Sequence, residues 1–540
     1  MRMRGGRRAI AHLALLTLFA VTVRLLFVAP YPTGWDDVDF ALALEQYDLA
    51  RMQPHFPGYP VYILAAHLFH SWMDDPFLTL TVLSAVAGGF TVIPLWLLFH
   101  EMGSAAAARL TVWMYTVAPL PLITSIQPMS DSLGAFLAAW LAFFSWSAAA
   151  EGRLQDGVSR NGGMSWALAA SGITLGLLLG VRVSYLALSL LWLWASVQVL
   201  RNREVAQKLR VRIAVISCGA GAFTCCIWVT ALILSTGGID SFLALAVSFT
   251  GGHFSDWGGT YQAGASLADR AKLFLFRQIG GAGLGTIWWG NGESGRWISF
   301  VMAGIGISGL AVRRDRLPFK HRVFLFVWII PYLLWAFFAQ NVEKPRHILP
   351  LLPPLLYLLV VGLEGIAYRV GEAIQRIWNE RNGSGRILTV FGMIWIAALI
   401  SVSYPILKEA DSKESPMVQL ARYVKANVQE KDSLIFTWEE QRVLEYMSPD
   451  HTSIRLRKWE DFRTEILQYE VPPRRILGTS AMVAGLDREV SGFFQPVAVF
   501  QGNPWLYPTY HRIVLYEGTP LLLEELRRGE GETAWKSKHY

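Results

Sequence analysis

The residues best suited to chemistry in this chain are carboxylates in a stretch that directly follows the first long apolar run. The stretch GWDDVDFALALEQYDLARMQPHFPGYPVYI, Gly34 to Ile63, holds five acids, one His and three Pro. Its first acids, Asp36 and Asp37, come within a few residues of the apolar run. A carboxylate at a water–lipid boundary is costly to desolvate, and it could act as the base that takes a proton from a hydroxyl or amine acceptor during group transfer. The alternative is an ordinary solvated loop rich in acids.

A second acid, Asp131, opens a later apolar run after a Pro-bearing turn, in TSIQPMSDSLGAFL. Asp is favoured at helix N-termini because it caps the backbone and complements the helix dipole. Taken by itself, Asp131 is therefore interpreted as a cap. It gains interest because the orientation predicted below places it on the same side of the membrane as Asp36.

A third candidate is the cluster of Lys344, Arg346 and His347 in NVEKPRHILPLLPPLLYLL. The forked guanidinium of Arg346 suits phosphate oxygens. Basic residues at a membrane surface also pair with lipid headgroups, and that alternative stays open.

The composition places these residues in a membrane protein. Of the 540 residues 53% are hydrophobic and only 16% are charged, whereas soluble chains carry about a quarter charged residues. The net charge of +7 is modest and the basic residues cluster in short loops, so nucleic acid is not the expected partner. The three cysteines, Cys218, Cys225 and Cys226, share one apolar run, which argues against a disulfide framework or a zinc site.

Long apolar runs predict about eleven membrane-spanning helices, because about 20 residues cross the hydrocarbon core. The first run is longer than the apolar part of a signal peptide and lacks a small-residue cleavage site, so we interpret it as an uncleaved span. The run Gly58–Trp72 is too short to cross and is expected to lie in the interface. The predicted spans are 9–29, 77–99, 106–123, 132–150, 164–181, 183–200, 211–235, 296–312, 322–340, 347–366 and 387–405.

The basic loops set the predicted orientation. With a cytoplasmic N-terminus, the basic loops 201–212, 313–322 and 368–386 all fall in the cytoplasm, as the positive-inside rule requires. The outer side then holds the opening acids, a long Gly-rich loop at 235–295 and the short loop 340–347. We therefore expect a multi-pass protein of the inner cell membrane.

From about Ile406 the chain becomes polar and holds 20 of the 41 acids. Strand-like runs alternate there with helix-like ones, which predicts a small α/β domain. An odd number of spans makes this domain, 406–540, extracytoplasmic and separates it from a membrane domain at 1–405. The strand-like runs are SLIFTW, TSIRLR, RRILGTSAMV, PVAVF and HRIVLYEG, and the helix-like runs are PMVQLARYVKANV, EEQRVLEYM and LLLEELRR.

Four stretches, in this order, resemble the membrane glycosyltransferases of the GT-C superfamily. The branch that they resemble is that of the protein O-mannosyltransferases and the lipid A aminoarabinose transferase. The resemblance covers roughly residues 10–405 and implies a polytopic α-helical fold of the GT-C type, often with a soluble outer domain. The stretches are WDDVDFALALEQYD, QPHFPGYPVYILAAHLF, PLPLITSIQPMSDSLGAFL and EKPRHILPLLPPLLYLL.

The resemblance implies roles for single residues. In that family an Asp of the first outer loop, usually followed by Glu, acts at the acceptor; Asp36 matches it, and Asp37 stands in place of the Glu. His55 and Tyr59 match an HPPxYY-like stretch, and Asp131 matches the acid of the second outer loop.

Three further positions follow the same resemblance. Arg346 matches the basic residue of an RY-like motif that meets the donor phosphate. His347 replaces the Tyr of that motif, and Lys344 lies beside it. Arg182, in GVRVSY, resembles a further substrate-facing position.

The implied reaction passes a sugar from a polyprenyl-phosphate-linked donor to a protein, glycan or lipid acceptor, with inversion at the anomeric carbon. A divalent cation stays open, because some GT-C enzymes use one and others do not. Two other classes remain as alternatives. One is a transporter or lipid flippase, for which paired halves with interrupted helices and mid-membrane charges would be expected. The other is a membrane scaffold that displays its C-terminal domain.

Overall fold

The computed structural model describes residues 6–150, 161–255, 258–262, 266–286, 293–312, 317–378, 383–429, 433–469, 474–486 and 491–522. The chain packs as two compact units. We call Met1–Ala29 with Leu42–Lys408 the membrane unit, and Pro30–Ala41 with Glu409–Tyr540 the C-terminal unit. The acidic segment Pro30–Ala41 thus packs with residues more than 360 positions later in the chain.

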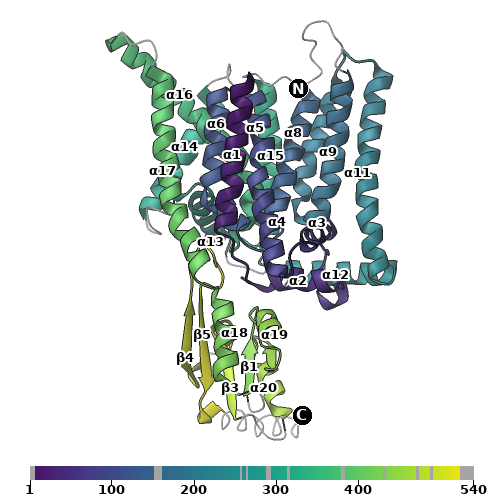
Figure 1. The fold of residues 1–540 in the computed structure, drawn as a ribbon, viewed down its shortest axis with the longest axis vertical. Coiled ribbons are helices and arrows are strands. Elements are labelled where there is room, and N and C mark those ends of the chain that lie inside the picture. Colours follow the sequence, from purple (N-terminus) through teal and green to yellow (C-terminus); the bar gives the residue numbers. More distant parts are fainter. Residues whose placement is uncertain are drawn as a thin grey trace. The chain divides into compact units, whose positions relative to one another are not determined.

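The membrane unit is a bundle of long apolar helices (Figure 1). Among the residues that the structure describes, nine helices are long and apolar enough to cross a membrane, and a tenth is a bent pair. All eleven predicted runs fall on helices, and the one run that is not among these ten, 296–312 in α14, has a shorter apolar part, Trp297–Ser308. The chain is therefore a multi-pass membrane protein, as the composition predicts. The helices that make up these runs, some of them in consecutive pairs, are α1 Gly6–Leu26, α4 Pro76–Phe90, α5 Val92–Met102, α6 Ala105–Val117, α7 Pro119–Ser125, α8 Asp131–Ala150, α9 Asn161–Val181, α10 Ser189–Arg201, α11 Gln207–Ser235, α14 Glu293–Val312, α15 Phe319–Ala339, α16 Leu352–Trp378 and α17 Gly383–Ser412.

The bent pair of helices, α6 and α7, precedes α8 in the chain and sets the direction from which the chain enters it. Helices α6 and α7 meet at an angle of 52°. Ala118 between them is extended, with φ −63° and ψ 143°, and Pro119 follows it. Proline lacks an N–H and pushes the preceding residue out of the helical region, so the break occurs where the sequence dictates it. The short α7 then leads into the turn before Asp131.

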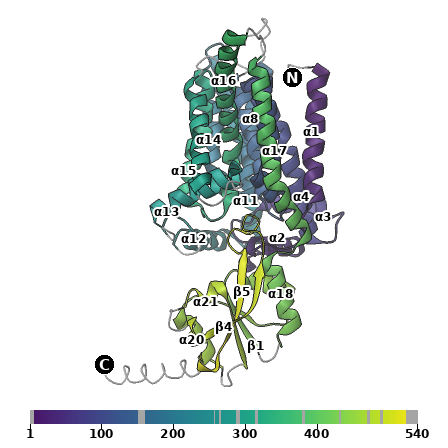
Figure 2. The same cartoon turned by 90° about the vertical axis from the view of Figure 1, so that its left-hand side faces the viewer.

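Short helices lie across the end of the bundle opposite the chain's N-terminus (Figures 1 and 2). The apolar helix α3, at the run predicted to be interfacial, has 11 residues, too few to cross a membrane. The Gly-rich loop predicted at 235–295 is largely helical where the structure describes it, so that prediction was wrong. Glycines lower helix propensity by only about 1 kcal/mol each, and packing outweighs this. These segments are α3 Pro60–His70, α12 Ile239–Ser255, α13 Leu267–Lys272 and the π-helical η3 Leu273–Gly283, and the other short helical segments of the chain are α2 Trp35–Glu45, η1 Leu49–Arg51, η2 Val183–Leu188 and η5 Pro345–Leu351.

The C-terminal unit is built around a five-stranded sheet of order β2-β1-β3-β5-β4, which confirms the predicted α/β class. Strand β1 pairs in parallel with β2 and β3, while β5 runs antiparallel to both β3 and β4. Every residue of β1 is buried, as expected for a central strand covered on both faces. The elements are α18 Pro416–Asn427, β1 Ser433–Thr437, α19 Gln441–Met447, β2 Ser453–Arg455, α20 Trp459–Leu467, β3 Arg475–Thr479, α21 Ser480–Val483, β4 Phe494–Gln501 and β5 Arg512–Gly518.

Two local predictions for this unit differ from the structure. Helix α20 was not predicted, although Phe462 and Ile466 from it enter the core. The run predicted as one strand to Val483 becomes helical at Ser480. The predicted helix LLLEELRR lies mostly outside the described residues.

Helices α9 and α11 approach closely along a stripe of glycines. A Cβ at Gly172 would overlap the backbone carbonyl of Ser217, and one at Gly176 would overlap the Thr224 side chain. The close approach lets the Ser217 hydroxyl donate to the Leu168 carbonyl across the helices, at 2.6 Å. Small residues serve this purpose in membrane bundles, where packing rather than the hydrophobic effect holds helices together.

We predict that Gly172→Ala lowers the melting temperature of the detergent-solubilised protein, because the added methyl group forces α9 away from α11. Overpacking of this kind costs about 1–3 kcal/mol. Gly219→Ala on α11 is the matched control: a Cβ there meets nothing within 4 Å, and alanine is the better helix former. Equal melting temperatures for the two variants would contradict the role of the stripe.

Candidate active site

The polar centre of the membrane unit is a buried ion pair between Asp131 and Arg182. The Nη1 atom of Arg182 lies 2.9 Å from Oδ2 of Asp131, and the two side chains are 6% and 1% exposed, Arg182 first. The same nitrogen donates to Oγ of Ser130 at 3.0 Å. Because a buried charge without its partner costs several kcal/mol, this pair must form whenever the helices pack.

Helix ends bring the two charges together. Asp131 is the first residue of α8, where the helix dipole favours an anion. Arg182 follows the last residue of α9 in an extended conformation, with φ −151° and ψ 104°, and a helix C-terminus favours a cation. Its backbone N–H still bonds to the Leu178 carbonyl at 2.8 Å. The side-chain cap that the sequence suggests for Asp131 does not form, because neither carboxylate oxygen accepts a hydrogen bond from the backbone. The carboxylate faces the Arg182 guanidinium instead.

Three tyrosines lie around this pair. The Arg182 guanidinium carbon lies 5.6 Å from the centre of the buried Tyr185 ring. Tyr185 contacts Tyr332 edge to face, with ring centres 5.7 Å apart. Tyr332 and Tyr59 both interact electrostatically with Arg182. Sequence reasoning missed Tyr185 and Tyr332; the position of Tyr185 three residues after Arg182 was the only signal.

Arg346 joins the same cluster from another part of the chain. It lies half-buried on η5, and its Nη1 atom is 3.5 Å from the sulfur of Met129, two residues before Asp131. Tyr185 interacts electrostatically with both Asp131 and Arg346. Two charges that are 215 positions apart in the sequence therefore share one site.

Two polar residues, Lys344 and His347, flank Arg346 at the start of η5. Lys344 is the residue that precedes the first turn of η5. His347 is 9% exposed, and its carbonyl accepts a hydrogen bond of 3.0 Å from the Tyr332 hydroxyl. This bond ties η5 to α15 beside the tyrosines.

His55 and Tyr59 contact each other just before the start of α3. The His55 Nε2 and Tyr59 hydroxyl atoms are 3.0 Å apart, and the imidazole stacks on Phe249 of α12. Tyr59 adopts a left-handed backbone with φ 47°, directly after Gly58 with φ 89°. A non-glycine residue seldom takes this conformation, and where it does, the surroundings hold it.

The opening acids belong to the C-terminal unit. Asp37 is buried, and its Oδ2 accepts from the Thr33 amide at 2.6 Å and the Thr33 hydroxyl at 2.5 Å. Asp39 is also buried and is paired with Arg442. Asp36 is half-buried and so is the most accessible of the three.

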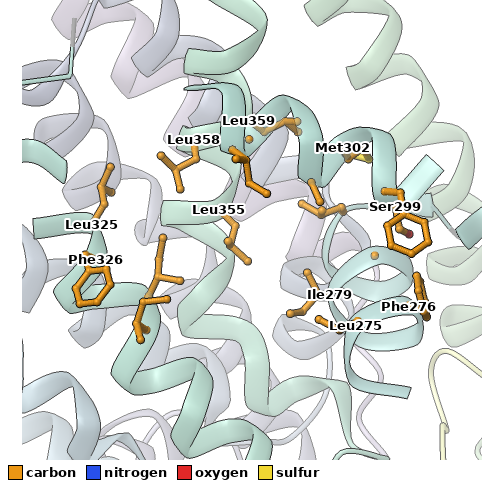
Figure 3. Close-up of a pocket in the computed structure, with 18 of the residues that line it drawn as sticks. Leu275, Phe276, Ile279, Ser299, Met302, Leu325, Phe326, Leu355, Leu358 and Leu359 are labelled. Atoms are coloured by element: carbon orange, nitrogen blue, oxygen red, sulfur yellow. The ribbon is translucent and has the colours of Figure 1, made fainter. Parts of the chain in front are cut away.

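An apolar cavity of about 470 Å³ lies among η3, α14, α15 and α16 of the membrane unit. Figure 3 shows Leu275, Phe276 and Ile279 of η3 opposite leucines of α15 and α16. Leu355 of α16 is among the lining residues, and α16 continues η5, which carries Arg346. At the rise of these helices, about 15 Å separates the two residues along the chain. Among the described residues no group of three or more His, Cys, Asp and Glu could hold a metal ion.

Comparisons with protein-family models and with curated proteins find no match. Solved structures do match. The oligosaccharyltransferase AglB from Archaeoglobus fulgidus, in complex with an inhibitory peptide and dolichol-phosphate, aligns with a TM-score of 0.52 and 13% identity over 96% of this chain and 77% of its own. ArnT from Cupriavidus metallidurans in the apo state aligns with a TM-score of 0.50 and 12% identity over 95% of this chain and 99% of its own.

Both proteins are GT-C glycosyltransferases. This chain has the GT-C fold. The fold expected from the four sequence stretches is thereby confirmed, including the C-terminal α/β domain that follows the helices.

We predict that Arg182→Met strongly destabilises the GT-C bundle, by about 3–5 kcal/mol, because it leaves Asp131 buried without a cation. The double variant Asp131→Leu/Arg182→Met should recover most of the lost melting temperature. Thermal unfolding in detergent measures both. The control is Lys272→Ala, which removes a pair with Asp269 in which both side chains are well exposed, and it should leave the melting temperature unchanged. A double variant no more stable than Arg182→Met would contradict the pairing.

Proposed function

We propose that this chain is a membrane glycosyltransferase that moves a sugar from a polyprenyl-phosphate donor to an acceptor at the outer face of the membrane. The observation that carries the proposal is the convergence of Arg346 with the buried Asp131–Arg182 pair in a chain with the GT-C fold. A half-buried guanidinium beside a buried ion pair is a site for an anion that develops charge during reaction.

The donor end of the proposed site is assigned to Arg346. Its forked guanidinium suits the phosphate oxygens of the donor, and it stabilises the negative charge of the departing lipid phosphate. Lys344 and His347 on the same η5 turn are proposed to contribute to the phosphate environment. The apolar cavity lined by η3 and α16 offers a place for the first isoprene units, within the short reach of Arg346. The AglB structure contains dolichol-phosphate, which supports a lipid-phosphate donor here.

The acceptor end is assigned to Asp36. In the proposed step its carboxylate takes the proton of the acceptor hydroxyl or amine. The freed electron pair forms the bond to the anomeric carbon, the bond from that carbon to the phosphate oxygen breaks, and its electrons stay on the lipid phosphate. Attack from the face opposite the leaving group gives inversion.

The remaining residues take supporting roles in the proposal. Asp131 is proposed to assist by holding the Arg182 guanidinium beside the tyrosines. Asp131 and Arg182 would then both face the bound substrates. His55 and Tyr59 are proposed to contact substrate at the start of α3, and Asp37 to shape the turn that presents Asp36. The transferred sugar is proposed to be of the mannose type. The acceptor is a protein, a glycan or a lipid, and the reaction proceeds with or without a divalent cation.

The orientation is part of the proposal. The strongly basic stretch RNREVAQKLRVR, which runs from the end of α10 into the start of α11, supports a cytoplasmic position for that end of the bundle. The opposite end, where α3, α12 and α13 lie, is then extracytoplasmic, in an inner cell membrane. The Asp131, Arg182 and Arg346 cluster would face the periplasmic side.

We predict that Asp36→Asn abolishes both sugar transfer and hydrolysis of radiolabelled polyprenyl-phosphate mannose by purified protein in lipid, while expression and melting temperature stay normal. Arg346→Ala should instead raise KM for the donor more than it lowers kcat, because it removes binding to the phosphate. Asp74→Asn, at an exposed acid, is the control and should retain full activity.

Two results would sink this assignment: full turnover by Asp36→Asn, or no turnover by wild-type protein with any of a panel of polyprenyl-phosphate sugars. Transbilayer movement of the same lipid without sugar transfer would favour the transporter or flippase class instead.

We predict that Gly306→Phe raises KM for a long-chain polyprenyl donor by about tenfold, since a ring in the cavity displaces apolar contacts worth roughly 1.4 kcal/mol. Gly306 lines the cavity, and a Cβ atom there would meet no neighbour within 4 Å. KM for a donor of two isoprene units should not change. Gly304→Phe is the matched control: it lies two residues away, is equally open, and does not line this cavity. Equal effects of the two variants would exclude the cavity as the tail site.

A further inference from the structure

The acidic segment Pro30–Ala41 packs inside the C-terminal unit although it is encoded between the first two long helices of the membrane unit. The chain leaves the membrane unit after Ala29 and rejoins it at Leu42, in the middle of α2. A loop whose two ends are so constrained needs its own contacts to adopt a single conformation, because its backbone entropy must be overcome.

The start of this segment is held by hydrogen bonds to the C-terminal chain. The Tyr31 hydroxyl donates to the Ala410 carbonyl at 2.6 Å and lies 3.1 Å from the Tyr507 hydroxyl. Burial raises the pKa of Tyr31 to about 12, so the phenol keeps its proton at neutral pH. The next carbonyl, that of Pro32, accepts from the Ser415 hydroxyl at 2.7 Å.

The helical part of the segment is held by a charge. Nε of Arg442, on α19, donates to Oδ1 of Asp39 at 2.8 Å. The Asp39 side chain is fully buried and that of Arg442 is 14% exposed. A pair so well removed from water is not screened like a surface pair, and truncating one partner removes the close counter-charge of the other.

Aromatic–guanidinium stacking adds a second contact. The Arg455 guanidinium carbon lies 4.7 Å from the centre of the Trp35 ring and 4.3 Å from that of Trp438. Arg442 also lies over Trp35, at 5.7 Å. Arg455 ends β2 and Trp438 follows β1, so the segment docks at the carboxyl edge of two parallel strands, where α/β sheets place ligand sites.

These contacts flank Asp36 on both sides. Trp35 precedes it, and Asp39 lies three residues later, which on a helix is a neighbouring position on the same surface. Thr33, three residues before Asp36, and Asp37, directly after it, are bonded to each other. Asp36 is therefore a half-buried acid between residues that are held in place.

We propose that Arg442 of the C-terminal domain is a positioning residue for Asp36: its ion pair with Asp39 and its stacking on Trp35 hold the acid in the orientation that proton transfer requires. This inference rests on the proposed function. It assigns the C-terminal domain a part in the reaction itself, in addition to any contact with the acceptor. A general base must lie within hydrogen-bond reach of its proton, and a shift of about 1 Å can cost a hundredfold in rate.

The test compares Arg442→Ala with Arg442→Lys in the full-length protein in lipid. We expect Arg442→Ala to lower kcat for hydrolysis or transfer of polyprenyl-phosphate mannose by tenfold or more, with KM for the donor unchanged. Arg442→Lys keeps the charge but not the planar fork, so it should recover part of kcat. Hydrogen–deuterium exchange in peptides from residues 30–45 should be faster in Arg442→Ala than in the wild type.

The matched control is Arg475→Ala. Arg475 is paired with Glu517 at 2.7 Å within the same sheet and makes none of the described contacts with Pro30–Ala41. It should leave kcat and the exchange of residues 30–45 unchanged. If Arg442→Ala does not fold, Asp39→Asn, which keeps the side-chain shape, is compared with Arg442→Lys in the same measurements.

Unchanged kcat in a folded Arg442→Ala protein would overturn the proposal, whatever its melting temperature. Unchanged exchange of residues 30–45 would overturn it as well, since the anchor would then not hold the segment. A wild-type protein that never turns over a polyprenyl-phosphate sugar would instead defeat the proposed function, and with it the part of Arg442 in transfer. In that case the exchange data alone still decide whether Arg442 anchors the segment.

Discussion

A charge buried in a helical membrane bundle must have a partner, and the Asp131–Arg182 pair is where this constraint acts on the membrane unit. The pair joins the first turn of α8 to the end of α9, and its distance of 2.9 Å leaves little freedom in how these helices meet. Tyr185, Tyr332 and Arg346 are arranged around it. Because separating two charges at low dielectric is expensive, the polar cluster and the helix packing stabilise each other.

The same constraint is met differently elsewhere in the chain. Arg24 of α1 is fully buried, and its guanidinium donates to the carbonyls of Ala20 and Thr116, at 2.9 and 3.3 Å. There the helix backbone, rather than a carboxylate, supplies the oxygen atoms. In the C-terminal unit Asp39 and Arg442 form another buried carboxylate–guanidinium pair. These three sets of contacts each join parts of the chain that are far apart in the sequence.

The candidate site was predictable in part. Apolar runs of about 20 residues located the helices, since length and hydropathy alone decide what can cross a membrane. Asp131, Arg182 and Arg346 were each selected at a helix end, and the structure brings them together. The tyrosines were missed because a buried aromatic in an apolar run carries no pattern that separates it from ordinary core. The Gly-rich stretch was expected to be a loop, whereas packing makes most of its described part helical.

What the sequence determined by itself was the membrane class, the spans and the α/β character of the C-terminal domain. These follow from local periodicity and run length, which are properties of neighbouring residues. What only the tertiary structure decided was which residues each acid of the opening stretch contacts and how deeply it is buried. Asp39 is paired with Arg442, 403 positions away, Asp37 is bonded to Thr33, and Asp36 is half-buried between them. No spacing rule distinguishes three acids within four residues; the partner that each one meets does so, and that partner is set by the packing of remote segments.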